Sequence, residues 1–132
     1  MDEKSLKSIP LFASLSKSER QRVAACTDEV DLTEGKVLVH QGEFAYEFFV
    51  IEEGTAEVLR NGEHVADLHP GDFLGEMGAV SKAPRNATVV AQSPMRVVVM
   101  TARDFRRIDA DMPGVAQQIR NAIAARSEIL VG

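Results

Sequence analysis

The middle of the chain alternates short apolar runs with turn-forming dipeptides. The runs are rich in valine, isoleucine and phenylalanine, and most of the turns between them contain glycine. Asn61-Gly62 is the strongest of the turn signals, because a two-residue type I′ turn needs a positive φ at both positions. Regularly spaced short strands of this kind predict a compact antiparallel β-roll or sandwich. We expect its strands at residues 37–39, 48–51, 56–59, 65–68, 87–91 and 96–100.

The residues before this region predict helices. Ser16 and Glu19 have the spacing of a capping box, which predicts a helix that begins directly after Ser16. Cys26 lies among apolar neighbours near the end of that helix, and we predict that it is a core residue. Residues 6–15, around Pro10, form an irregular apolar segment that we expect to be partly helical and to dock on the core.

The last third of the chain returns to a helical pattern. Thr101 is followed three residues later by Asp104, which is typical of a helix N-terminus. Pro113 suits the first position of a second helix. One face of that helix carries Val115, Ile119, Ile123 and Leu130. The fold class predicted is therefore α+β and mainly β, a jelly-roll-like barrel flanked by N-terminal and C-terminal helices.

Length and charge exclude several classes of protein. A chain of 132 residues suits one domain, with an N-terminal helical segment (1–30), a β-roll (31–100) and C-terminal helices (101–131). A net charge of −5 argues against nucleic-acid binding, which needs clustered lysine and arginine. One cysteine excludes an internal disulfide framework. No apolar stretch resembles a signal peptide or a membrane span, so we expect a cytoplasmic protein without membrane contact.

Residues 71–91 carry the candidate chemistry. Gly75 allows a close backbone approach, and residues 76–80 are expected to form one helical turn whose free N–H groups face an anion. Arg85 has the planar fork that suits a phosphate, whereas Glu76 suits hydroxyl groups as an acceptor. A single arginine beside one carboxylate points to a sugar phosphate or nucleotide of low charge. The alternative reading of Glu76 and Arg85 is a surface ion pair.

This segment resembles the phosphate-binding cassette of cyclic nucleotide-binding domains. The matching residues are Gly75-Glu76-Met77-Gly78 and Pro84-Arg85-Asn86-Ala87-Thr88. The resemblance extends to the strands and glycine turns before the cassette, among them residues 35–38, 41–43, 49–51, 53–58 and 70–73, and to the N-terminal helices. It covers residues 5–130 and implies an eight-stranded antiparallel β-roll with its cassette at residues 73–89.

The resemblance also implies roles for individual residues. Glu76 would accept the ribose 2′-hydroxyl and Arg85 would pair with the exocyclic phosphate oxygens. The remaining contacts would come from the amides of the cassette and from apolar side chains against the sugar or base, and these residues are Leu74, Gly75, Met77, Gly78, Ala87 and Val89. Arg126, late on the last helix, is either a lid over the base or a solvated side chain.

The cassette departs from the family pattern at two positions. Gly78 stands where alanine or serine is usual, which loosens the short helix without removing its amide. Asn86 stands where the family commonly has threonine, serine or alanine. A threonine there favours cGMP and an alanine cAMP, so Asn86 leaves the choice of base open, and we favour cAMP.

The function predicted is that of a cyclic nucleotide sensor and not of an enzyme, since no catalytic constellation stands out. Ligand capture would move the C-terminal helix, and an effector protein, a fused effector domain or a second copy of the chain would be the partner. We expect no cofactor beyond the ligand, cAMP or cGMP. Two alternatives remain: a nucleotide-blind scaffold that acts through a protein partner, and a metal-dependent cupin enzyme. The cupin reading rests on His40, His64 and His69, which lack cupin spacing.

Overall fold

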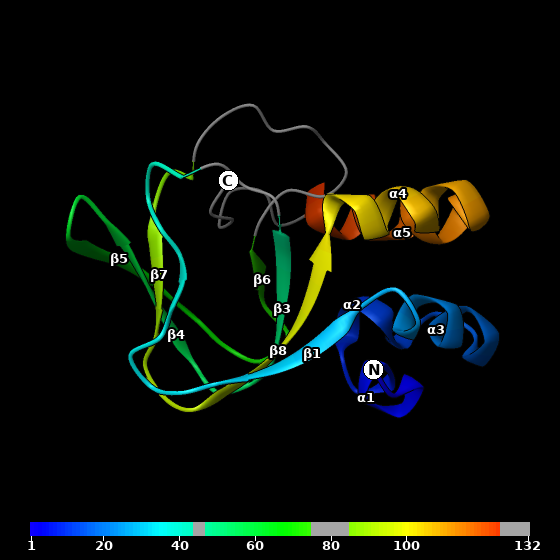
Figure 1. The fold of residues 1–132 in the computed structure, drawn as a ribbon, viewed down its shortest axis with the longest axis horizontal. Helices are drawn as coiled ribbons and strands as arrows, with labels where there is room; N and C mark the ends of the chain where they lie inside the picture. Colours follow the sequence, from blue (N-terminus) through cyan, green and yellow to red (C-terminus); the bar gives the residue numbers. More distant parts are fainter. Residues whose placement is uncertain (44–46, 75–84, 125–132) are drawn as a thin grey trace.

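The computed structural model describes residues 1–43, 47–74 and 85–124. In this part of the chain, two four-stranded antiparallel sheets form a roll, and the helices lie together at one end of it (Figure 1). The helices are α1 (Glu3–Lys7), α2 (Pro10–Ala13), α3 (Lys17–Ala24), α4 (Ala102–Asp111) and α5 (Pro113–Ala124). The strands are β1 (Asp28–Leu32), β2 (Val37–Val39), β3 (Glu47–Glu53), β4 (Ala56–Arg60), β5 (Glu63–Leu68), β6 (Phe73–Leu74), β7 (Thr88–Ala91) and β8 (Met95–Thr101).

The sheet order is β1-β8-β3-β6 in one layer and β2-β7-β4-β5 in the other. This arrangement confirms the predicted fold class of an eight-stranded roll flanked by helices. The predicted type I′ turn between β4 and β5 is also confirmed, since Asn61 has a φ of 55° and Gly62 a φ of 82°. Two of the strands, β1 and β6, were not among the individual ranges predicted. β1 is mostly charged and exposed at a sheet edge, and β6 has only two residues, so neither has an apolar alternation to reveal it.

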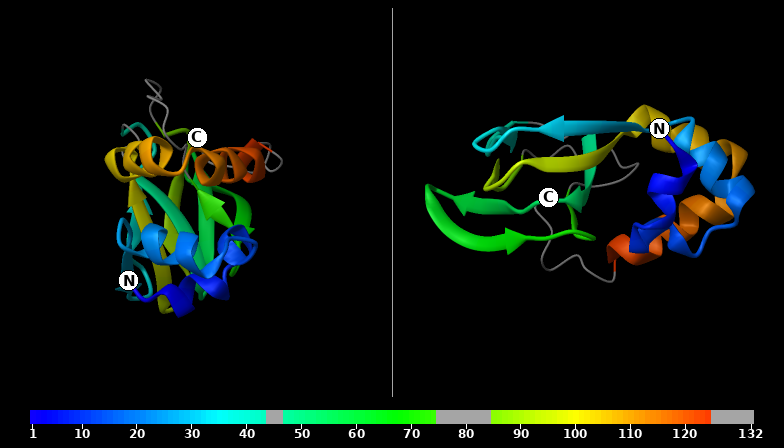
Figure 2. Two further views of the ribbon diagram at one scale, coloured as in Figure 1. Left: turned by 90° about the vertical axis from the view of Figure 1, so that its right-hand side faces the viewer. Right: turned by 90° about the horizontal axis from the view of Figure 1, so that it is seen from below.

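The central strands of the first sheet, β3 and β8, are buried on both faces. Phe49 and Ile51 point into the roll, whereas Phe48 and Val50 belong to a second core shared with the helices. Alternate residues of a strand point to opposite faces, so a strand covered on both sides must be apolar throughout. This explains the continuous apolar run of β3. The second view of Figure 2 shows the helices gathered against one end of the strands.

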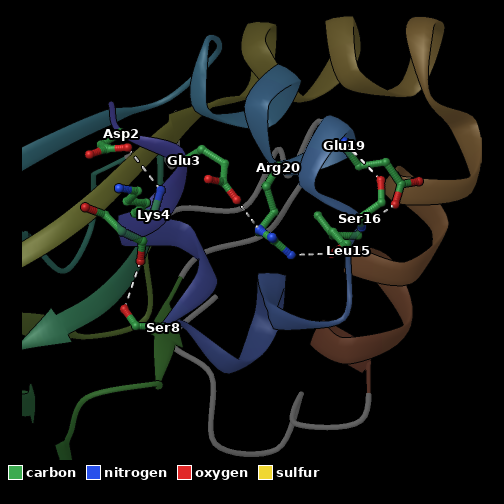
Figure 3. Close-up of polar contacts among 9 residues, drawn as sticks. Asp2, Glu3, Lys4, Ser8, Leu15, Ser16, Glu19 and Arg20 are labelled. Atoms are coloured by element: carbon green, nitrogen blue, oxygen red, sulfur yellow. Dashed lines mark hydrogen bonds and ion pairs between the residues drawn. The ribbon is translucent and has the colours of Figure 1, made fainter.

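The N-terminal helices are held together by polar contacts as well as by their apolar faces (Figure 3). Ser16 and Glu19 form the predicted capping box at the start of α3. Arg20, which is 8% exposed, donates from its Nε to a Glu3 carboxylate oxygen at 2.7 Å and from its Nη1 to the Leu15 carbonyl. Its charge is thus neutralised between α1 and α3. Cys26 packs against this helical core as a half-buried residue, not at its centre.

The C-terminal helices pack against each other and against the outer face of β8. Thr101 and Asp104 form a capping box at the start of α4, as their spacing predicted. An Arg120 Nη2 donates to an Asp109 carboxylate oxygen at 2.8 Å, and the same guanidinium lies 5.0 Å from the centre of the Phe105 ring. The side chain of Ile123, together with Leu130 and Arg126, lies outside the described residues. Among the helices described, none is both long and apolar enough to cross a membrane.

The Glu52 carboxyl group, near the end of β3, is the described acid with the largest change in proton affinity. Burial raises its pKa from 4.5 to about 8, and a side-chain hydrogen bond with Glu29 and the negative charges of Glu29 and Glu53 act in the same direction, whereas Arg96 lowers it. Its Oε2 atom is buried with no hydrogen-bond partner among the described residues. Neutral Glu52 is therefore the form that the folded chain favours.

We expect Glu52 to make stability depend on pH. The folded chain keeps this proton up to a pH of about 8, whereas the unfolded chain releases it near 4.5, so the folded chain binds more protons between these values. The free energy of unfolding of the wild type should therefore fall as the pH rises through that window, relative to Glu52→Gln. We expect a change of about 1–2 kcal/mol, less than the full shift implies, because the side chain is partly solvated.

Urea unfolding of the wild type and Glu52→Gln at pH values from about 5 to about 9 measures this difference. Glu34→Gln, which removes an exposed carboxylate from a turn, is the matched control. A constant difference between the wild type and Glu52→Gln over the whole range would contradict the raised pKa.

Candidate functional site

A cavity of about 500 Å³ opens between β2 and the start of β3. Among the described residues, its walls combine one arginine, two glutamates, a histidine and an apolar strip. The lining residues are Leu38, Val39, His40, Gly42, Glu43, Glu47 and Arg85. A pocket of this size accommodates a small molecule of the size of a nucleotide.

Arg85 is held in this cavity at both its backbone and its side chain. Its N–H donates to the Glu43 carbonyl at 2.6 Å, and its carbonyl accepts from the Gly42 N–H at 2.9 Å. These two backbone hydrogen bonds join Arg85, which lies before β7, to Gly42 and Glu43, which lie after β2. The side chain then crosses to the other sheet, where an Nη2 donates to the Glu47 carbonyl at 2.7 Å. Arg85 therefore connects the two sheets at this end of the roll.

The Arg85 guanidinium is a buried cation with an unused donor. The residue is only 4% exposed, and its Nη1 is buried with no hydrogen-bond partner among the described residues. Burial lowers the pKa of Arg85, and the nearby Glu47 carboxylate acts in the opposite direction. A desolvated guanidinium gains strongly from an oxyanion that accepts two of its N–H groups. Arg85 is therefore not a surface side chain, whereas Glu76, the other residue of the predicted ion pair, lies outside the described residues.

The other charged residues among the described lining of the cavity are acidic. Glu43 and Glu47 both line it, so a ligand with several negative charges would meet repulsion from two carboxylates and attraction from one guanidinium. An anion with a single negative charge and additional hydroxyl groups suits this wall better. The arrangement can therefore bind and orient such an anion.

The other predicted site residues that the structure describes lie beside this cavity or deeper in the roll. Leu74, Ala87 and Val89 are each 0% exposed and belong to the apolar core inside the roll. Asn86 is exposed, and its carbonyl accepts a hydrogen bond from the Arg60 Nε at 3.2 Å. The other predicted residues, Gly75, Glu76, Met77, Gly78 and Arg126, lie outside the described residues.

Glu47 is the site residue that the sequence did not reveal. It lies 38 residues from Arg85 in the chain and contributes its backbone carbonyl, a group that every residue type carries. The sequence around Glu47 is rich in acids and has few bases, but this pattern did not indicate which acids would face Arg85. His40 and Glu43 were likewise not assigned to the pocket.

The three histidines do not gather at a common site. His40 lines the cavity, whereas the Nδ1 of His64, on β5, lies 2.8 Å from a carboxylate oxygen of Glu57, on β4. Within residues 1–43, 47–74 and 85–124, no three side chains of the histidine, cysteine, aspartate or glutamate type are placed to hold a metal ion.

The sequence and the fold of the chain are similar to those of known proteins. The family model described as the cyclic nucleotide-binding domain matches residues 29–111. A cAMP-dependent protein kinase regulatory subunit from Mycosarcoma maydis is 37% identical over 125 residues, which cover 88% of this chain and 24% of the relative. The chain spans about a quarter of the length of the curated relatives it matches.

Two solved structures extend this comparison. The regulatory domain of Toxoplasma gondii PKA, crystallised with cAMP, has a TM-score of 0.73 and 26% identity, and the match covers 93% of this chain and 48% of that one. The N-terminal domain of a transcriptional regulator from Streptomyces coelicolor has a TM-score of 0.76 and 26% identity, and the match covers 94% of this chain and 90% of that one.

Proposed function

Because the chain belongs to the cyclic nucleotide-binding domain family, we propose that it binds a cyclic purine nucleotide, with cAMP preferred over cGMP, and acts as a regulatory module and not as an enzyme. The observation that carries this proposal is the buried Arg85 guanidinium: the residue lines a cavity of nucleotide size, and its Nη1 has no hydrogen-bond partner among the described residues. A cyclic phosphate diester supplies the oxyanion that this donor lacks.

The charge of the cavity favours the cyclic form over open nucleotides. A cyclic phosphodiester carries one negative charge, and one guanidinium neutralises it. A phosphate monoester carries up to about two negative charges at neutral pH, as phosphorylated side chains do, and would meet uncompensated repulsion from Glu43 and Glu47. We therefore expect cAMP to bind more tightly than 5′-AMP.

The other ligand contacts follow from the family resemblance. Glu76 would accept the ribose 2′-hydroxyl, and the amides of Met77, Gly78 and Ala87 would complete the phosphate cradle. The resemblance also gives Leu74 and Val89 as apolar contacts of the sugar or base, although both are buried in the core and neither lines the cavity, and it gives Arg126 as the candidate lid. Removing the Glu76 carboxylate with Glu76→Gln should weaken binding of cAMP more than binding of its 2′-deoxy analogue.

A continuous set of contacts connects the cavity to the C-terminal helices. The Glu47 carbonyl that accepts from Arg85 belongs to the first residue of β3, which pairs with Thr101 at the end of β8. Thr101 is also the N-cap of α4. Binding of a phosphate at Arg85 would thus act on the residue pair from which α4 starts, and the ligand shifts those helices by its preference for one arrangement. An effector protein or effector domain would be the recipient of this signal.

Isothermal titration calorimetry with cAMP, cGMP and 5′-AMP tests the proposal. We expect heat and saturable binding with cAMP, weaker binding with cGMP and little with 5′-AMP. A folded wild-type protein that binds neither cyclic nucleotide would instead indicate the nucleotide-blind scaffold.

A further inference from the structure

The tip of the β4–β5 hairpin forms hydrogen bonds with Gln41, in the segment after β2, and with Asn86, in the segment before β7. The hairpin stands at the end of the roll away from the helices (Figure 1). On one side of its tip, the Gln41 side chain makes a reciprocal pair with Asn61: its Nε2 donates to the Asn61 Oδ1 and its Oε1 accepts from the Asn61 N–H, both at 2.9 Å. On the other side, the Arg60 Nε donates to the Asn86 carbonyl at 3.2 Å.

These contacts bracket Arg85 along the chain. Gln41 directly precedes Gly42 and Glu43, whose backbone groups bond the Arg85 backbone, and Asn86 directly follows Arg85. The Gln41 N–H also donates to the Thr88 Oγ1 at 2.9 Å, which ties the two segments to each other. Three contacts therefore hold the backbone around Arg85: Gln41 with Asn61, Gln41 with Thr88, and Arg60 with Asn86.

The hairpin residues are exposed, which separates them from the packing of the core. Gln41, Arg60 and Asn61 are all on the surface, and none of them lines the cavity beside Arg85. A single exposed hydrogen bond contributes little to global stability, about 0.5–1.5 kcal/mol. A displacement of about 1 Å at the base of a guanidinium, however, is enough to lose a bidentate contact with a phosphate. The network is thus better suited to positioning than to stability.

We propose that Arg60 and Gln41 are positioning residues for Arg85, and that the β4–β5 hairpin tip fixes the backbone geometry with which Arg85 receives the cyclic phosphate. This inference rests on the proposed function for its ligand. Arg60 acts through the hydrogen bond of its Nε to the Asn86 carbonyl and not through its positive charge. Gln41 acts through its pair with Asn61.

Two substitutions at Arg60 separate the hydrogen bond from the charge. In Arg60→Gln, an amide N–H group stands at the same distance along the side chain as the arginine Nε, so the donor is kept and the charge is lost. In Arg60→Met, a side chain of similar length loses both. We expect Arg60→Met and Gln41→Met to weaken cAMP binding by about 5- to 10-fold, and Arg60→Gln to restore most of that loss. Arg106→Met, at an exposed arginine of α4, is the control that should bind as the wild type does.

The measurements are calorimetry with cAMP, thermal unfolding of the ligand-free proteins, and NMR of the arginine Nε–H groups without ligand. We expect melting temperatures close to that of the wild type, and an Arg85 Nε–H signal that shifts or broadens in Arg60→Met and Gln41→Met but not in Arg60→Gln. Equal loss of affinity in Arg60→Gln and Arg60→Met would overturn the proposal in favour of a charge effect. Unchanged affinity in all variants would overturn it as well, because the hairpin contacts would then have no effect on binding. If the wild type binds no cyclic nucleotide, the proposed function fails by itself, and the NMR signals still decide the positioning role.

Discussion

Replacing Arg85 with alanine should weaken cAMP binding by roughly 30- to 3,000-fold. Truncating one partner of a buried charged pair costs about 2–5 kcal/mol, and each 1.4 kcal/mol is a factor of ten in affinity. Arg85 belongs to this class because it is 4% exposed, lines the cavity and has an Nη1 with no hydrogen-bond partner among the described residues. A competition assay with a fluorescent cAMP analogue would measure a loss of this size.

Arg85→Lys is the matched variant for this experiment. It keeps a positive charge but replaces the planar fork with a single ammonium group, so we expect affinity between that of the wild type and that of Arg85→Ala. Because Arg85→Ala also removes the hydrogen bond to the Glu47 carbonyl, far-UV circular dichroism of both variants checks that the fold is intact. Wild-type affinity in a folded Arg85→Ala protein would contradict the site.

Replacing Gly54 with alanine should lower the free energy of unfolding by about 3–5 kcal/mol. Gly54, in the turn between β3 and β4, has a φ of 89°, and a Cβ there would lie 2.3 Å from the Pro94 backbone carbonyl and 2.9 Å from the Met95 Cγ. Backbone strain and overpacking against a second turn therefore add. Denaturant unfolding would measure the change.

Gly35→Ala is the control that isolates the contact with Pro94. Gly35 has the same φ of 89°, but nothing lies within 4 Å of the position where its Cβ would be. We expect it to lose only about 1–2 kcal/mol, from backbone strain alone. Equal destabilisation by the two substitutions would mean that the close approach of the two turns contributes nothing.

The signals that could be predicted from the sequence are the local ones. The Ser16–Glu19 and Thr101–Asp104 boxes each close within three residues, and the turn at Asn61 depends on two. Such features can be predicted from residue types and spacing, because their hydrogen bonds join near neighbours. The charged strand β1 lacks such a local signal, because it is defined by its pairing with β8.

At the candidate site, too, the residue types could be interpreted from the sequence, whereas the contacts between distant segments could not. The residue types of segment 71–91 indicated an anion of low charge, because a single arginine stands beside one carboxylate there. The burial of that guanidinium, its bond to the Glu47 carbonyl and its support by the β4–β5 hairpin depend on segments that the chain brings together only when the two sheets close. The sequence alone thus predicted six of the eight described strands and the caps, and it gave the kind of ligand as a prediction. Tertiary structure decided which backbone groups surround the cation, because any residue can supply a carbonyl and only packing selects one.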